Sequence, residues 1–257
     1  MRPPSSSPAA NSSSSTTRRR SSRTRRASAS RTTSPASSGD GTALDAFVEG
    51  DAERADRVVK SRDLDARCAE VERACVRTIA LQNPVAGDLR FLLSSFAVAA
   101  ECRGLSALAD RFGQYALATD GGRFGPVDVR ALSELAVGTL GTAVDAYRRL
   151  AAADGRDSAL ADDDGPCYGT VRRGERLDRF CANATEALAR SGASGESGDA
   201  PGGRDAGGRL VATALAVGDL RRVGIHAVTI AGRVLYAATS DDGLTDRYDT
   251  RRASART

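Results

Sequence analysis

The sequence predicts an all-α protein made of two tandem three-helix bundles, preceded by a disordered tail. Apolar residues recur at three- and four-residue steps over most of residues 42–240, which is the spacing of one helix face. The chain has no Trp and only 4% aromatic residues, so its 40% of hydrophobic residues are mostly Ala, Leu and Val. Such a composition favours close-packed helices over β-sheet. Finally, segments of the two halves of the chain align with each other.

The N-terminal segment, residues 1–41, is predicted to be a disordered Ser/Arg-rich tail. Its first 40 residues hold eight Arg, one acidic residue and no Val, Ile, Leu, Phe or Tyr. This composition buries too little apolar surface to offset the entropy lost on ordering. Three interpretations stay open: a solvated tail or a start codon assigned too far upstream, a basic arm that contacts nucleic acid or anionic lipid, and a targeting segment.

The charge distribution argues against a body that binds nucleic acid. The formal net charge is +4, but residues 1–40 supply eight of the 37 basic residues and only one of the 33 acidic ones. The remaining 29 basic and 32 acidic residues give the body a charge of about −3, whereas nucleic-acid-binding domains are strongly basic.

The five cysteines are odd in number and have no C-x-x-C spacing, as expected for reduced thiols in a cytoplasmic protein. Cys68 and Cys75 lie seven residues apart, which predicts two core residues on one helix face. No stretch reaches the 18 consecutive apolar residues of a membrane span, so we expect no direct membrane insertion.

The first repeat, residues 42–122, is expected to contain three helices. Their apolar stripes run over residues 44–59, 64–79 and 89–115. Asn83-Pro84 separates the second helix from the third, because the residue before a proline is pushed out of the α region. The third helix is expected to begin at about Asp88.

The second repeat, residues 127–240, shows the same plan. Its expected helices lie at about residues 132–147, 170–190 and 209–238, with a Gly-rich loop at 191–208 and a disordered C-terminal tail at 241–257. The last helix is apolar on several sides, which suits a central or interface helix. If Val228 or Leu235 faces a partner, that helix is a contact surface.

Two internal matches indicate a duplication. Residues 44–47 match residues 144–147, and residues 101–111 match residues 219–229. The first match has a shift of 100 residues and the second a shift of 118 residues. An insertion of 18 residues in the Gly-rich loop fits this difference. A duplicated three-helix unit explains both matches.

The segment from Ala80 to Arg90 resembles the PhoU family. Gln82, Pro84, Asp88, Leu89 and Arg90 stand where that family has a Gln-x-Pro-x-Ala-x-Asp-Leu-Arg segment between the second and third helices of its first repeat. Residues 47–51 are similar to the turn-containing first helix of the family, and residues 222–231 to its closing helix. The resemblance spans about residues 42–240 and implies two three-helix bundles.

The chain departs from the family at its metal ligands. Each family repeat typically has a Glu-x-x-x-Asp pair on its third helix, and carboxylates four residues apart can jointly bind a cation. Those positions are occupied here by Arg103 and Ala107 in the first repeat, and by Arg221 and Ile225 in the second. Since Arg cannot ligate a metal and repels one, we expect no metal and no cofactor.

The resemblance implies a non-enzymatic regulator of phosphate uptake and phosphate-starvation signalling that acts by protein–protein contacts. The implied partners are the phosphate ABC importer or its sensor and regulatory proteins, with a homodimer as another option. No catalytic residue is predicted, because no G-x-S-x-G, P-loop or Rossmann motif occurs. Two alternatives stay open: a helical scaffold that kept the fold but lost the phosphate role, and a nucleic-acid-associated regulator that uses the basic N-terminal arm.

Three candidate residues also have simpler structural interpretations. Asp88 is expected to cap the third helix, and Arg90 to form a surface ion pair. His226 lies in an apolar helix, where a hydrogen-bonded structural histidine is favoured over a ligand or general base.

Overall fold

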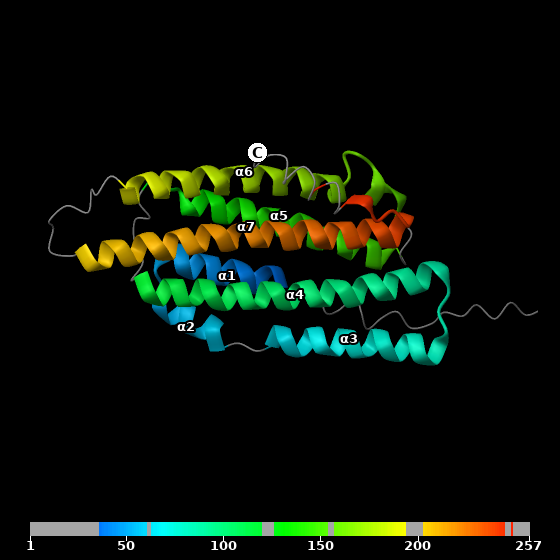
Figure 1. Ribbon diagram of the computed structural model, residues 1–257. Coiled ribbons are helices and arrows are strands. Elements are labelled where there is room, and N and C mark those ends of the chain that lie inside the picture. Colours follow the sequence, from blue (N-terminus) through cyan, green and yellow to red (C-terminus); the bar gives the residue numbers. More distant parts are fainter. Residues whose placement is uncertain are drawn as a thin grey trace, which may run out of the picture.

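The computed structural model describes residues 36–60, 63–119, 126–153, 157–193, 203–244 and 248 (Figure 1). Its helices are α1 (Ala36–Glu49), α2 (Ala52–Lys60), α3 (Asp63–Gln82), α4 (Ala86–Thr119), α5 (Val129–Ala152), the 3₁₀ helix η1 (Ser158–Ala161), α6 (Pro166–Ala193) and α7 (Gly203–Thr239). Within these ranges there is no strand. The predicted all-α fold class is confirmed.

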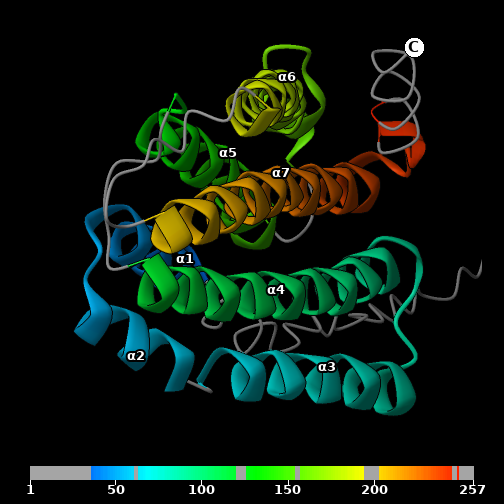
Figure 2. The same ribbon diagram turned by 60° about the vertical axis from the view of Figure 1, so that its left-hand side comes forward.

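The helices form two units joined by their longest members. In the first unit, α1, α2 and α3 all pack on α4, and α2 and α3 lie in a row along it (Figure 2). In the second unit, α5, α6 and α7 each contact the other two and form a three-helix bundle. The most extensive contact of all is between α4 and α7, which run antiparallel, and α1 also reaches α5.

A glycine divides the first apolar stripe into two helices. The sequence predicted one helix over residues 44–59, whereas α1 ends at Glu49 and α2 starts at Ala52. Gly50 has a φ of 69°, a left-handed conformation that glycine adopts without strain. The Asp51 side chain then accepts a hydrogen bond from the Arg54 backbone at 2.9 Å, which caps α2.

The N-terminal boundaries of two helices lie earlier than predicted. The first helix begins at Ala36, inside the segment that was predicted to be a disordered tail, and residues 1–35 lie outside the described part of the chain. Helix α4 begins at Ala86 rather than Asp88, so Asp88 lies in its first turn and is not its N-cap. A carboxylate there still interacts favourably with the positive end of the helix.

The C-terminal boundaries differ as well. The predicted loop at 191–208 is shorter, because α6 continues to Ala193 and α7 starts at Gly203; residues 194–202 are not described. In the predicted C-terminal tail, Leu244 and Tyr248 are buried. The Tyr248 ring lies beside Gly174 of α6, so this part of the tail packs on the bundle, contrary to the prediction.

Helix α7 is the central helix, which explains its apolarity on several sides. It packs against α4, α5 and α6 at once. Val228 and Leu235 are each only 1% exposed, so the suggestion that either faces a partner is wrong. A charge at either position would enter the core rather than an interface.

Helix α4 is also unusually apolar. Over the described residues, Ala86–Leu117 is the one helix long and apolar enough to cross a membrane by length and composition. Such a segment was not predicted from the sequence. In the structure, α1, α2, α3 and α7 surround much of α4, which accounts for its composition.

An aromatic cluster holds α1 on α4. The Phe47 ring lies 6.1 Å from the Phe112 ring and 6.0 Å from the Tyr115 ring, measured between centroids. Phe47 and Phe112 are fully buried, and burial of each such side chain contributes roughly 1.5–3 kcal/mol. This cluster also positions the Tyr115 hydroxyl at the interface between α4 and α7.

Candidate functional site

At the first position where the resemblance implies a metal ligand, the structure has an ion-paired arginine. Arg103 projects from α4 toward α3, where its Nη1 donates a hydrogen bond to Oε2 of Glu72 at 2.8 Å. Nη2 lies 2.7 Å from Oε1 of the same carboxylate. The guanidinium therefore faces both oxygens of Glu72, an acid that the sequence analysis did not single out.

The second position repeats this arrangement. The Arg221 Nε on α7 donates a hydrogen bond to Oδ1 of Asp178 on α6. The hydrogen bond with Asp178, followed by the charge of that carboxylate, raises the pKa of Arg221 despite partial burial. In both units an arginine of the last helix thus pairs with an acid of the helix before it.

These residues do not fit a metal site. The other two family positions, Ala107 and Ile225, offer no ligand atom, and Glu72 and Asp178 already neutralise the two arginines. Among the described residues there is no group of three or more His, Cys, Asp or Glu that could hold a metal ion. A divalent cation would have to displace a guanidinium in each unit.

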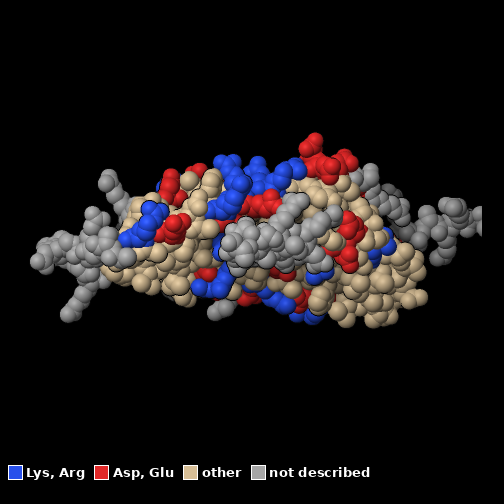
Figure 3. All heavy atoms as spheres, turned by 45° about the horizontal axis from the view of Figure 1, so that its top comes forward, with Lys and Arg blue, Asp and Glu red and all other residues tan. Residues whose placement is uncertain are grey.

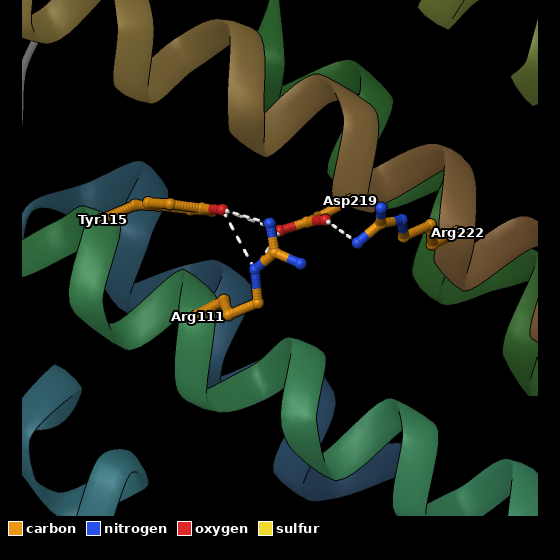
Figure 4. A network of polar contacts seen from close by, with 4 residues as sticks. All are labelled: Arg111, Tyr115, Asp219 and Arg222. Carbon is orange, nitrogen blue, oxygen red and sulfur yellow. Dashed lines mark hydrogen bonds and ion pairs between the residues drawn. The ribbon is translucent and has the colours of Figure 1, made fainter.

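A second polar cluster lies between the units, around Asp219 of α7 (Figure 4). Asp219 is 1% exposed. Its Oδ2 accepts a hydrogen bond from the Tyr115 hydroxyl at 2.8 Å and lies 3.0 Å from Nε of Arg111. Arg111 also donates to the Tyr115 oxygen, and Arg222 reaches Oδ1 of Asp219 at 3.4 Å. This buried carboxylate is paired and hydrogen-bonded, as its burial requires.

The network changes the acidity of its members. Burial, and then the hydrogen bond to Asp219, raises the pKa of Tyr115, so this hydroxyl keeps its proton. The hydrogen bond to Tyr115, assisted by the charge of Asp219, raises the pKa of Arg111. Tyr115 and Arg111 therefore keep their protons, which fits a structural connection between the units.

One further pair crosses the same interface. Nδ1 of His226 on α7 lies 2.6 Å from Oε2 of Glu101 on α4. His226 is therefore hydrogen-bonded, as the structural interpretation of this residue requires. The ring fits because residue 104 is glycine: a Cβ there would lie 2.6 Å from Cε1 of His226.

The internal repeat explains the position of these clusters. At the shift of 118 residues, Glu101 corresponds to Asp219, and each carboxylate reaches across to the other long helix. The repeat alignment pairs these two acids without indicating a role for either. Their place beside the positions where the resemblance implies metal ligands was a usable signal, but their partners, Arg111, Tyr115 and His226, could be identified only from the packing of α4 on α7.

The motif residues Gln82–Arg90 form the turn between α3 and α4. Asn83 and Ala86 have φ values of 45° and 40°, so the chain reverses through left-handed backbone on both sides of Pro84. The predicted surface ion pair of Arg90 does not occur among the described residues: its Nε is buried and has no hydrogen-bond partner there. The motif thus shapes the turn between the two helices.

Five exposed apolar side chains lie in this turn or on the two helices that it joins. Leu81 is 77% exposed and Val85 is 72% exposed. Val76 on α3, with Leu93 and Phe96 on α4, are also exposed. We call these five residues the turn patch. On the face of the molecule that includes α6, basic and acidic side chains are intermingled (Figure 3).

Comparison with known proteins supports the family resemblance. Residues 41–114 match the family described as "PhoU domain". A relative in Methanothermobacter thermautotrophicus, named "Phosphate-specific transport system accessory protein PhoU homolog 1", is 37% identical over 68 residues. That alignment covers 26% of this chain, and the chain spans about a third of the relative, 31% of its length.

Two solved structures share the fold over most of the chain. The crystal structure of PhoU from Pseudomonas aeruginosa has a TM-score of 0.65 and 22% sequence identity, and the match covers 82% of this chain and 94% of the Pseudomonas chain. The crystal structure of the phosphate transport system regulatory protein PhoU from Streptococcus pneumoniae has a TM-score of 0.64 and 16% identity, and the match covers 83% of this chain and 93% of the Streptococcus chain. At these identities the likeness establishes the fold alone. It agrees with the predicted tandem plan.

Proposed function

We propose that this chain regulates phosphate uptake and phosphate-starvation signalling in the cytoplasm, because its residues 41–114 match the PhoU domain family. It acts through protein contacts and catalyses no reaction. The observation that carries the proposal is the family match, which includes the Gln82–Arg90 turn. The named relative is an accessory protein of a phosphate-specific transport system, which supports this role.

The regulation does not depend on a bound metal. The four family ligand positions hold two ion-paired arginines and two apolar residues. A protein that works by docking needs a stable fold, and the two ion pairs link α3 to α4 and α6 to α7. Loss of the ligands is therefore compatible with a retained regulatory role.

The turn patch is the proposed contact surface for the phosphate importer or its sensor. Leu81 and Val85 each expose more than 70% of their area, in the segment that carries the family motif. Apolar side chains exposed next to each other mark interaction surfaces more often than scattered ones do. Since neither side chain supports the fold, both can be changed without loss of core packing.

Labelled-phosphate uptake in a deletion strain tests the proposal. The strain is complemented with the wild-type gene, with Leu81→Asp/Val85→Asp, or with Val211→Asp/Leu215→Asp, whose positions on α7 are also exposed. We expect deletion to change uptake and its response to starvation, the first variant to behave like the deletion, and the second to rescue.

Other outcomes point to the alternatives. Uptake identical to wild type in the deletion strain would discard the regulatory proposal in favour of a scaffold without a phosphate role. A copy that lacks residues 1–35 addresses the nucleic-acid alternative, because it keeps every described helix. Rescue by that copy would show that the basic arm is dispensable, whereas failure with intact folding would favour the arm.

A further inference from the structure

Four exposed arginines lie close together on α6: Arg172, Arg173, Arg176 and Arg179. We call these four residues the basic face. Since a helix turns by 100° per residue, the first, third and fourth of them lie within about 60° of one another. Arg173 lies to the side, over α5, where its Nη1 atom is 3.5 Å from the position that a Cβ of Gly138 would take. The basic face therefore covers the outer surface of α6.

The charge of the basic face is only weakly neutralised by its surroundings. Within the described part of the chain, its last three arginines form no ion pair. Arg172 donates a hydrogen bond to the Asp163 carbonyl and lies 4.0 Å from the carboxylate of Asp164, which is fully exposed, so this pair is weak. Of the two acids between these arginines, Asp178 pairs with Arg221 on α7, and only Glu175 remains.

An aromatic ring lies within the basic face. The guanidinium carbon of Arg176 lies 5.2 Å from the centroid of the Phe180 ring, and Phe180 is 41% exposed. A cation–π contact restricts the arginine side chain, so less entropy is lost when its N–H groups bind a ligand. The ring adds an apolar contact next to the charges.

The basic face is short and has acids beyond both of its ends. From Arg172 to Arg179 the helix rises about 10 Å, a length that three or four extended residues span. Exposed acids precede it at 162–164, and the exposed Glu186 follows it. In Figure 3 basic side chains gather along the upper edge of the molecule, with acidic ones on both sides. A broad anionic surface, such as a membrane or a nucleic-acid duplex, would be repelled by these acids, whereas a short acidic segment meets only the arginines.

We propose that the basic face is a docking surface for a short acidic segment of a partner protein. The carboxylates of the segment accept charge-assisted hydrogen bonds from Arg173, Arg176 and Arg179, and a neighbouring apolar side chain covers the Phe180 ring. This surface is separate from the turn patch. Its binding can be measured directly, without reference to phosphate uptake.

Site-specific photo-cross-linking of the full-length protein tests the location. The photoreactive residue p-benzoylphenylalanine replaces Phe180 in one protein and Val76 in another. Val76 is a stringent control, because it is exposed and lies between Arg73 and Arg77 on α3. The probe is a rhodamine-labelled peptide with three consecutive aspartates, and the same peptide with three asparagines is its control. At low salt we expect capture of the aspartate peptide at position 180 and not at position 76, with little capture of the asparagine peptide.

Two charge reversals of equal size test the residues. With the cross-linker at position 180, Arg173→Glu/Arg176→Glu/Arg179→Glu should lower capture about tenfold or more, because three favourable charge pairs become repulsive. The matched variant Arg67→Glu/Arg73→Glu/Arg77→Glu on α3 should change capture by no more than about twofold, since it alters only the distant field. All six arginines are exposed, so both variants should keep wild-type helicity by circular dichroism.

Three results would overturn the proposal. The first is equal capture of the aspartate peptide at positions 180 and 76. The second is an equal loss of capture in the two charge-reversal variants, which would show a response to net charge alone. The third concerns the class of ligand: the α6 variant would weaken binding to phosphatidylserine vesicles or duplex DNA as much as binding to the peptide.

Discussion

The His226 ring of α7 lies against Gly104 of α4, in the space that a side chain at position 104 would need. A Cβ on residue 104 would lie 2.6 Å from Cε1 and 3.0 Å from Nε2 of His226. The ring cannot easily move away, because its Nδ1 is held 2.6 Å from Glu101. The observed position of the His226 ring therefore requires glycine at position 104.

Gly104→Ala should destabilise the wild-type protein but stabilise a variant that lacks the ring. An alanine gains about 1 kcal/mol of helix propensity, yet overpacking against His226 costs about 1–3 kcal/mol. We expect a net loss of about 1 kcal/mol in the wild type. In His226→Ala the clash is absent, so Gly104→Ala should gain about 0.5–1 kcal/mol. Urea denaturation of the four proteins gives both values.

Gly141→Ala is the matched control for this cycle. A Cβ at Gly141 on α5 would meet no atom within 4 Å, so the change should stabilise both backgrounds equally. If Gly104→Ala had the same effect with and without His226, the dependence of the two residues on each other would be disproved.

Asp219→Ala should be more damaging than removal of any one of its partners. It leaves the Tyr115 hydroxyl and the Arg111 guanidinium without their shared acceptor. Because Arg111 is 37% exposed and partly solvated, we expect a loss of about 2–3 kcal/mol, below the range for fully buried pairs. Thermal or urea unfolding measures it.

Arg222→Ala provides the comparison on the same carboxylate. Its side chain is 58% exposed and reaches Asp219 at only 3.4 Å, so its loss should cost less than about 0.5 kcal/mol. Equal losses for Asp219→Ala and Arg222→Ala would show that the buried network does not connect the two units.

The sequence predicted the helices well because their signal is local. Apolar spacing located every long helix, and Asn83-Pro84 located the turn between α3 and α4. The start of α1 was missed because its Ala-, Ser- and Gly-rich first turns carry no large apolar side chain. The break at Gly50 needed a backbone angle that apolar spacing does not encode.

The arginines of the candidate site could be predicted, but their acidic partners could not, because those partners are distant in sequence. Arg103 and Arg221 were recognised as replacements for metal ligands. Glu72 and Asp178, which neutralise them, lie on other helices and follow no local pattern. Asp219 was visible in the repeat alignment, but its burial depends on the contact of α4 with α7.

The purified protein should contain no stoichiometric iron, manganese or zinc, and elemental analysis can test this. Arg103→Glu/Ala107→Asp should create a site, because Glu72 lies within 3 Å of the present guanidinium and would join the two new carboxylates. We expect bound metal only in the double variant, and less when Glu72→Ala is added. Metal bound equally by the wild-type protein would contradict the assignment of these positions as ion pairs.

The stability of the protein should fall steeply above pH 9, because burial raises the pKa of the Cys75, Cys167 and Cys181 thiols in the folded state. Burial raises the pKa of Cys167 to about 12 from an ordinary value of about 9. A raised pKa means that the contribution of this group to stability is complete below about pH 9 and is lost as pH rises toward 12. The loss is about 1.4 kcal/mol per pH unit for one such group.

Cys167→Ala removes this contribution and should flatten the pH dependence. At pH 8 the variant should be less stable than wild type, because a fully buried side chain is truncated. As pH rises to 11 the difference should shrink by about 2–3 kcal/mol. Urea denaturation in reducing buffer at several pH values measures both curves.

Cys68→Ala is the control: the pKa of Cys68 is lowered in the folded state, so its removal should not flatten the curve. Parallel curves for wild type and Cys167→Ala would show that the Cys167 thiol ionises as easily in the folded protein as in the unfolded chain.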